Sequence, residues 1–205
     1  DAQGIDKIQK YASLFGLDQK SGVEIEEMDP HVSDTDAVRS SIGQGTNNYA
    51  PVQLARYVTT IANEGNCYDL TLVNEIKNID GRTVYKSDNV PKNTVDLTDS
   101  QWAVIKQGMR QLVSEHTSPS ALINQINVNV AGKTGTAEED TTRPDHALFV
   151  SFAPYENPEV SVTCVIPHGY TSGNAEELAG MVYAYMYDPD KLDTLDITGN
   201  NQMSD

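Results

Sequence analysis

The chain has 205 residues, of which 30 are acidic and 14 basic, so its formal net charge is −16 with neutral histidines. This charge excludes a general nucleic-acid binder, because such proteins need a basic surface. Hydrophobic residues make up 38% of the chain, enough for one sizeable core. No apolar run approaches the ~20 residues of a membrane helix. We therefore expect one domain, with any targeting signal outside this chain.

Two amphipathic helices are predicted in the N-terminal half. Apolar residues recur at helical spacing over 5–15, and Gly16 follows where a C-cap glycine belongs. A second helix is predicted to begin at Pro51 and to end before Gly65. The acidic stretch between Gly16 and Gly45 has no such period, and we interpret it as a surface excursion.

A hairpin and a capped helix are predicted next. An Asp-Gly pair at 80–81 lies between two β-rich pieces over 71–85, which is a strong hairpin signal. Thr98 and Gln101 form a capping box, and the apolar spacing that follows predicts a helix to about Ser114.

Three strands are predicted in the C-terminal half, after a short helix that starts near Ser118-Pro119. They cover 128–137, 147–153 and 160–166 and are joined by a polar loop and a turn, as in an antiparallel meander. Because helices precede and follow these strands, the pattern favours an α+β domain with helices packed on an antiparallel sheet.

The last predicted helix is capped by Asn174, with Glu177 at its third position. Its buried stripe is expected to consist of Leu178, Met181, Val182 and Tyr185. Residues 188–205 are acidic and lack periodicity, so we predict a domain over 1–187 followed by a disordered tail.

Cysteines and histidines give no metal pattern in the sequence. Cys67 and Cys164 are too few for a disulfide framework and lack ligand spacing, so both are expected to be free. The four histidines form no i,i+4 or Cys-His cluster. No metal or other cofactor is predicted.

One motif carries chemistry: Lys133-Thr134-Gly135-Thr136, on the first of the three late strands. A glycine inside a strand is commonly kept where a ligand or another backbone approaches closely, which suits Gly135. The two threonines share one face of the strand, so their hydroxyls could hold a carboxylate. Lys133 would attract an anionic group and stabilise developing negative charge. The alternative is a lysine on a solvated edge strand beside an accidental glycine.

This motif, extended to Ala137, resembles the third signature of the penicillin-binding transpeptidases and serine β-lactamases. The resemblance spans about 5–186 and is strongest to the class B penicillin-binding proteins. The similar segments are Phe15-Gly16-Leu17, Gly22-Val23-Glu24-Ile25, Ser41-Ile42-Gly43-Gln44-Gly45, Gln53-Leu54-Ala55, 61–65 and 145–154. It implies the C-terminal portion of a transpeptidase fold that lacks its N-terminal part.

The resemblance also implies a function, namely cross-linking of peptidoglycan stem peptides by serine acyl transfer, with β-lactam antibiotics bound at the same site. It implies catalytic roles for Lys133, as a cationic helper, and for Thr136, as an oxyanion-hole N–H. Thr134, Gly135 and Thr136 would bind substrate, with Gly135 letting the acyl chain lie along the strand. The parent would be anchored to the bacterial cell membrane, face outward and work with other cell-wall synthesis proteins.

The chain departs from the family in lacking a nucleophile. No serine has a lysine three residues later, and Ser-x-Asn occurs only at 87–89 and 172–174, downstream of the place where the family has it. We interpret these two matches as a hairpin end and a helix cap, and we predict that this chain alone is inactive. Two alternatives stay open: a non-catalytic module that binds peptidoglycan or β-lactams, and a D,D-carboxypeptidase or β-lactamase.

Three other features receive structural interpretations. Gly43 and Gly45 are expected to form a turn with positive φ. Asp145 and His146 are expected to fix the loop before the next strand rather than act as an acid and a base. The strand over 160–166 should have an open edge, through which the isolated chain is expected to self-associate.

Overall fold

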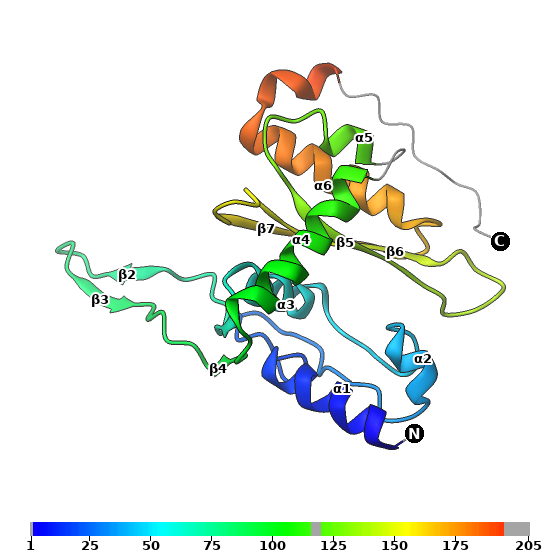
Figure 1. Ribbon diagram of the computed structural model, residues 1–205. Helices are drawn as coiled ribbons and strands as arrows, with labels where there is room; N and C mark the ends of the chain where they lie inside the picture. Colours follow the sequence, from blue (N-terminus) through cyan, green and yellow to red (C-terminus); the bar gives the residue numbers. More distant parts are fainter. Residues whose placement is uncertain (1, 116–119, 195–205) are drawn as a thin grey trace. The chain divides into compact units, whose positions relative to one another are not determined.

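The computed structural model describes residues 2–115 and 120–194 (Figure 1). The chain divides into two compact units: Asp1–Thr60 with Glu64–Asp96, and Ile61–Asn63 with Leu97–Asp205. Helices and antiparallel strands occur in both units, which confirms the predicted α+β class. Within the described ranges, no helix is long and apolar enough to cross a membrane.

The first unit contains three helices and two pairs of short strands. The helices are α1 (Ala2–Leu14), α2 (Ala37–Ser41) and α3 (Pro51–Ala62), whose last residues belong to the second unit; the strand pairs are β1 (Asn66–Cys67) with β4 (Asn93–Thr94), and β2 (Glu75–Lys77) with β3 (Thr83–Lys86). Both predicted helices are confirmed by α1 and α3. Gly16 and Gly65 follow them with φ of 74° and 106°, values that glycine adopts without strain.

Arg56 holds the end of α1 to α3. Its side chain is 1% exposed, and its guanidinium donates to the carbonyl oxygens of Gly16 and, at 2.7 Å, Gln19. It also pairs with Asp69 at 3.2 Å. The Asp69 carboxylate thus offsets the buried charge and two carbonyl oxygens accept from it, while the Arg56 Nε–H has no partner in the described residues.

The stretch from Gly16 to Gly45 is not simply a surface excursion, and this prediction is wrong at several positions. Ser21, Glu27 and Ser33 are buried. The Glu27 carboxylate accepts from the Ser21 N–H and hydroxyl, each at 2.9 Å. Because these bonds replace water, an acidic residue is tolerated inside, which composition alone does not reveal.

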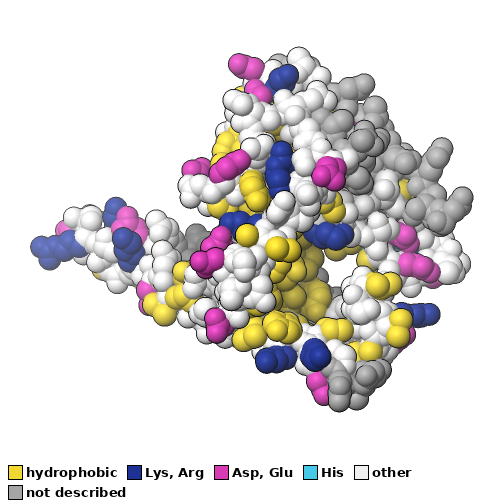
Figure 2. Space-filling view, viewed as in Figure 1, with side chains coloured by type: hydrophobic (Ala, Val, Ile, Leu, Met, Phe, Trp, Pro, Cys, Tyr) yellow, Lys and Arg dark blue, Asp and Glu magenta, His cyan; other side chains and the backbone are white. Residues whose placement is uncertain are grey.

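The β2–β3 hairpin is confirmed and projects from its unit (Figure 1). Its turn is closed by the Asn78 side-chain oxygen, which accepts from the N–H groups of Asp80 and Arg82 at 3.0 and 2.9 Å. All residues of both strands are exposed, and both basic and acidic side chains lie on the hairpin (Figure 2). Its base is closed by the β1–β4 pair, in which Asn66 opposes Thr94.

The second unit is built on a three-stranded antiparallel sheet in the order β5-β6-β7. The predicted meander is therefore confirmed. Its elements are α4 (Asp99–Glu115), α5 (Ser120–Ile123), β5 (Ala131–Ala137), β6 (His146–Ala153), β7 (Val160–Ile166), α6 (Ser172–Tyr187) and the 3₁₀ helix η1 (Pro189–Thr194). The capping box also forms, with the Thr98 N–H donating to the Gln101 side chain at 2.9 Å.

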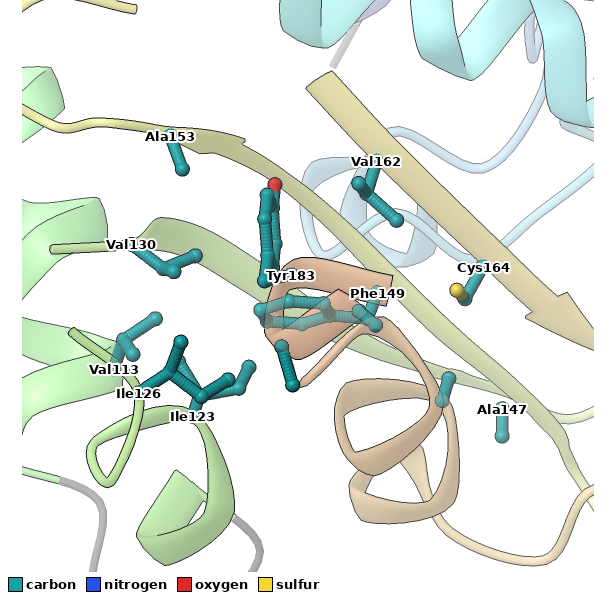
Figure 3. Close-up of a cluster of buried hydrophobic side chains, with 13 residues drawn as sticks. Val113, Ile123, Ile126, Val130, Ala147, Phe149, Ala153, Val162, Cys164 and Tyr183 are labelled. Carbon is teal, nitrogen blue, oxygen red and sulfur yellow. The ribbon is translucent and has the colours of Figure 1, made fainter. Parts of the chain in front are cut away.

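The core of the second unit lies between α6 and one face of the sheet. Phe149 and Tyr183 are fully buried at the centre of this cluster (Figure 3). Ser151 donates to the Val162 carbonyl at 3.0 Å and lies 3.0 Å from the Tyr183 hydroxyl, which satisfies both buried hydroxyl groups. Burial raises the pKa of Tyr183, so it stays a neutral phenol.

Two details of α6 correct the sequence prediction. The N-cap is Thr171, whose hydroxyl accepts from the Gly173 N–H, whereas Asn174 lies inside the first turn and donates to the Gly169 carbonyl at 2.8 Å. The predicted buried stripe is wrong as well, because Leu178, Val182 and Tyr185 are exposed. The buried positions are Gly173, Ala175, Glu176, Ala179, Gly180, Tyr183 and Ala184.

The chain after α6 begins with η1 rather than with an irregular tail. Leu192 of this 3₁₀ helix packs against the core of the second unit. The remaining predicted tail, 195–205, lies outside the described residues, as does Ser118-Pro119. The predicted domain boundary between 187 and 188 stays a prediction.

Candidate active site

The predicted motif lies on β5, at one edge of the β5-β6-β7 sheet. Thr134 pairs with Phe149 and Thr136 with Ala147, so both threonine side chains project from the face that carries the core residues of β6. Lys133 and Gly135 pair with Val150 and Leu148 on the other face. The structure therefore places the two hydroxyls side by side on one face of an edge strand.

Lys133 lies against the backbone of its own strand. Its side chain is exposed, and Nζ donates to the Thr134 carbonyl at 2.6 Å. Thr136 is also exposed, and Thr134 and Gly135 are half-buried. A positive charge and two hydroxyls are thus available to a ligand that approaches β5.

The two glycines of this segment have different surroundings. A Cβ at Gly132 would lie 2.4 Å from the Phe149 ring, a distance that real contacts do not reach. A Cβ at Gly135 would lie 3.4 Å from the Leu148 Cβ, which is ordinary contact. The fold therefore demands glycine at 132, whereas the predicted reason for Gly135, a close approach by a ligand, stays a prediction.

Side chains from other elements fix the start of β5. Arg110 of α4 donates to the Val130 carbonyl at 3.2 Å and to the Asn129 side chain at 3.0 Å. Asn129 in turn donates to Glu156 at 2.5 Å, and this amide lowers the pKa of the Glu156 carboxyl. The β6–β7 turn and α4 therefore both hold the residues that lead into the motif.

Two histidines and a glutamate lie at the opposite end of β5. Ala137 pairs with His146, the first residue of β6. The His146 Nδ1 accepts from the His168 N–H at 3.1 Å, and its Nε2 lies 3.3 Å from the Glu139 carboxylate. His146 thus connects the start of β6 to the loop after β7, in keeping with its predicted structural role. Sequence spacing missed His168, because the residues are brought together only by the meander.

The other sequence candidates have structural roles. Ser87 ends the hairpin, where its N–H donates to the Asn74 carbonyl at 2.9 Å. Ser172 begins α6, and Asn174 holds the preceding loop. Gly43 and Gly45 have φ of 86° and 93°, so the predicted turn is confirmed.

The arrangement on β5 suits recognition of an anion rather than bond cleavage by itself. An ammonium and two hydroxyls can hold a carboxylate, and backbone N–H groups of an edge strand can stabilise a negative oxygen. The sequence supplies no serine with a lysine three residues on. A nucleophile would have to come from another part of the protein.

Comparison with known proteins gives a consistent result. Residues 1–185 match the family model described as the penicillin binding protein transpeptidase domain. The chain is 29% identical over 180 residues to penicillin-binding protein 2B of Streptococcus pneumoniae, covering 80% of this chain and 26% of that protein. It is 31% identical over 174 residues to the peptidoglycan D,D-transpeptidase PbpA of Mycolicibacterium smegmatis, covering 81% and 35%.

Solved structures with the same fold agree. Penicillin-binding protein 2B from S. pneumoniae strain R6 superposes with a TM-score of 0.75 at 28% identity, covering 90% of this chain and 33% of that chain. A penicillin G acyl-enzyme complex of penicillin-binding protein A from M. tuberculosis superposes with a TM-score of 0.72 at 25% identity, covering 89% and 44%. The chain thus spans about a quarter to a third of the length of the curated relatives described above.

Proposed function

The chain belongs to the penicillin-binding protein transpeptidase family, and we propose that it is the C-terminal part of a class B peptidoglycan D,D-transpeptidase. The parent would join stem peptides of peptidoglycan and would be acylated by β-lactams. Its relatives are named as penicillin-binding proteins and D,D-transpeptidases, and the structure of one has been solved as a penicillin G acyl-enzyme complex. The single observation that supports a role for this chain is Lys133-Thr134-Gly135-Thr136 on the exposed edge strand β5.

The proposed reaction has two acyl-transfer steps. A serine hydroxyl outside this chain attacks the carbonyl carbon of the penultimate D-alanine, and the C–N bond to the terminal D-alanine breaks as the serine proton passes to the leaving amine. An amine of a neighbouring stem peptide then attacks the ester. The amide bond forms, the ester bond breaks, and a proton from the amine returns to the serine oxygen.

Within this reaction β5 would bind and orient the donor peptide. The hydroxyls of Thr134 and Thr136 would donate hydrogen bonds to the terminal carboxylate, and the Thr136 N–H would donate to the oxyanion. Gly135 would let the peptide lie along the strand edge, as in strand addition. Lys133 would release the Thr134 carbonyl, which it contacts at 2.6 Å, and turn its ammonium to the reacting groups.

Replacement of Lys133 in the parent protein tests this function. We expect Lys133→Ala to slow acylation by a fluorescent penicillin by roughly 10²-fold or more, the size of one preorganised contact in acyl transfer. Lys86→Ala serves as the control, because Lys86 is an exposed lysine on β3. Acylation unchanged by Lys133→Ala, together with a lowered melting temperature, would favour the interpretation of a solvated edge lysine.

The isolated chain gives an independent test. Because no serine here has a paired lysine, incubation with penicillin is expected to leave the intact mass of the 205-residue chain unchanged. A stoichiometric mass increase of one β-lactam on any serine would contradict the proposal that the nucleophilic serine lies outside this chain. Transfer of the acyl group to a stem-peptide amine by the full-length parent, rather than to water, would distinguish a transpeptidase from a carboxypeptidase or β-lactamase.

We further propose that the parent acts on the outer face of the bacterial cell membrane, because its substrate class lies there. An anchoring segment and any contacts with other cell-wall synthesis proteins would belong to parts of the parent beyond these 205 residues. Fractionation of cells that express the tagged parent, before and after alkaline extraction, would test the membrane attachment.

A further inference from the structure

Glu139, His146 and His168 form a three-residue cluster that the motif on β5 does not use. Glu139 follows β5, His146 begins β6, and His168 lies just after β7. One possible ligand atom from each residue lies within 4.8 Å of the others, and the two imidazole centroids are 4.8 Å apart. The cluster is independent of the proposed transpeptidase function, because it contains no residue of the motif.

The His168 ring makes a hydrogen bond of the kind that accompanies metal ligation by histidine. Its Nδ1 lies 3.1 Å from the Pro144 carbonyl oxygen. A carbonyl can only accept, so in the neutral ring Nδ1 carries the proton and Nε2 presents a lone pair. Ligating histidines characteristically donate their other ring N–H to a carbonyl or carboxylate in this way.

His146 and Glu139 provide two further donors at a suitable separation. The His146 Nε2 and the Glu139 Oε2 are 3.3 Å apart. Two ligands of a tetrahedral zinc ion, each ~2.0–2.1 Å from the metal, lie about 3.4 Å apart. A cation between them would replace the Nε2 proton of His146.

Binding at Nε2 has a consequence for the loop after β7. The His168 N–H donates to the His146 Nδ1 at 3.1 Å, so in the neutral ring the proton of His146 is on Nε2. Coordination through Nε2 moves that proton to Nδ1, and the His168 N–H must then turn away. His168 has a φ of 53°, so its backbone is in the left-handed region.

We propose that Glu139, His146 and His168 bind one divalent transition-metal ion, with Zn²⁺ as the best match to two imidazoles and a carboxylate. The ion would tie the end of β5, the start of β6 and the loop between β7 and α6 together, with water completing its coordination. Glu139 is exposed, which leaves an entrance from solvent, and the chain's net charge of −16 favours a cation.

The primary experiment is a calorimetric titration, in which Zn²⁺ is added to the chelator-treated 205-residue chain at moderate salt. We expect one ion per chain and at least tenfold weaker binding in His146→Ala, His168→Ala and Glu139→Gln. His31→Ala is the matched control and should bind Zn²⁺ as the unsubstituted 205-residue chain does. His31 is a surface histidine near Asp34, with 3.6 Å between His31 Nε2 and Asp34 Oδ1. No stoichiometric binding, or equal weakening by His31→Ala, would overturn the proposal.

Two measurements on the unsubstituted chain test the proposal without variants that could fail to fold. With Co²⁺ in place of zinc, we expect the visible bands of a nitrogen- and oxygen-ligated ion and no thiolate charge-transfer band, which excludes Cys67 and Cys164 as ligands. In NMR spectra, the imidazole nitrogens of His146 and His168 should shift with stoichiometric Zn²⁺ while those of His31 do not. A thiolate band, or shifts confined to other histidines, would place the ion elsewhere and reject this site.

Discussion

At the scale of single residues, Gly132 and Gly135 show that packing can require one glycine of a strand and leave room at another. Gly132 faces the ring of Phe149, and an added Cβ would lie 2.4 Å from it. Phe149 cannot withdraw easily, because it is fully buried in the cluster shown in Figure 3. Gly135 has room for a methyl group.

We predict that Gly132→Ala destabilises the chain by about 1–3 kcal/mol, the usual cost of overpacking a core. A loss of 1 kcal/mol lowers the melting temperature by roughly 2–4 °C in a protein of this size. Gly135→Ala is the control and should change the melting temperature little, since alanine fits there and glycine has the higher unfolded-state entropy. Equal losses in thermal unfolding of the two variants would contradict the difference in packing.

The position of the motif on a strand was predictable from the sequence, whereas its packing was not. Strand alternation, a local property, correctly predicts that Thr134 and Thr136 share one face of β5. The need for glycine at 132 depends on Phe149, a residue of the neighbouring strand that is known only once the register is known. The same holds for His146 and His168, which are 22 residues apart and meet through the meander.

At the scale of elements, α6 shows where sequence patterns fail. Counting large apolar residues predicted that Leu178, Val182 and Tyr185 face the core, yet all three are exposed. Small residues such as Ala179 and Gly180 face inward instead: a Cβ on Gly180 would lie 2.9 Å from the Leu122 side chain. Close packing selects small side chains at this contact, and hydrophobicity alone does not detect that choice.

By contrast, α4 was predictable because its signals are local. Thr98 and Gln101 bond each other within the same turn, with the Gln101 N–H 3.4 Å from the Thr98 hydroxyl. The buried Trp102 and Met109 follow at helical spacing. For α6, the cap is Thr171, three residues before the predicted Asn174, and only the conformation of the preceding loop reveals it.

We predict that Thr171→Ala destabilises α6 by about 1 kcal/mol, the typical cost of losing an N-cap. Thr171→Ser keeps the accepting oxygen and should behave like the original chain. Asn174→Asp separates the two candidates: an aspartate would serve well as a cap, but it cannot donate to the Gly169 carbonyl, so stability should fall. A neutral or stabilising Asn174→Asp in urea unfolding would restore Asn174 as the cap.

At the scale of the whole molecule, β7 is an edge strand within the described sheet. It carries no lysine, proline or charge over Val160–Ile166 to discourage pairing with another chain. The buried Thr163 hydroxyl also has no hydrogen-bond partner in the described residues. We expect this edge, together with the exposed apolar side chains of α6, to favour association of the isolated chain.

We predict that the isolated chain forms dimers or larger species through β7 as its concentration rises. Light scattering after size exclusion measures the mass, and hydrogen exchange should show β7 amides becoming slower on association. Val165→Lys should reduce association because it places a charge on this strand. Val84→Lys introduces the same charge on the exposed strand β3 and should not.

A strict monomer at all concentrations would count against this prediction. So would association that Val84→Lys and Val165→Lys reduce equally, since a general charge effect would then account for it. Association that persists unchanged in both variants would assign the contact to a surface other than β7.

The closed base of the β2–β3 hairpin makes its tip a suitable place for protein engineering. Asn66 and Cys67 oppose Thr94 and Asn93, so the chain leaves and returns at one point, and Ile79 near the tip is fully exposed. Lengthening a loop whose ends are already held costs little, since closure entropy grows only with the logarithm of loop length. An epitope or a fluorescent reporter inserted after Asp80 should therefore follow the parent through purification and imaging while the sequence of β5 stays intact.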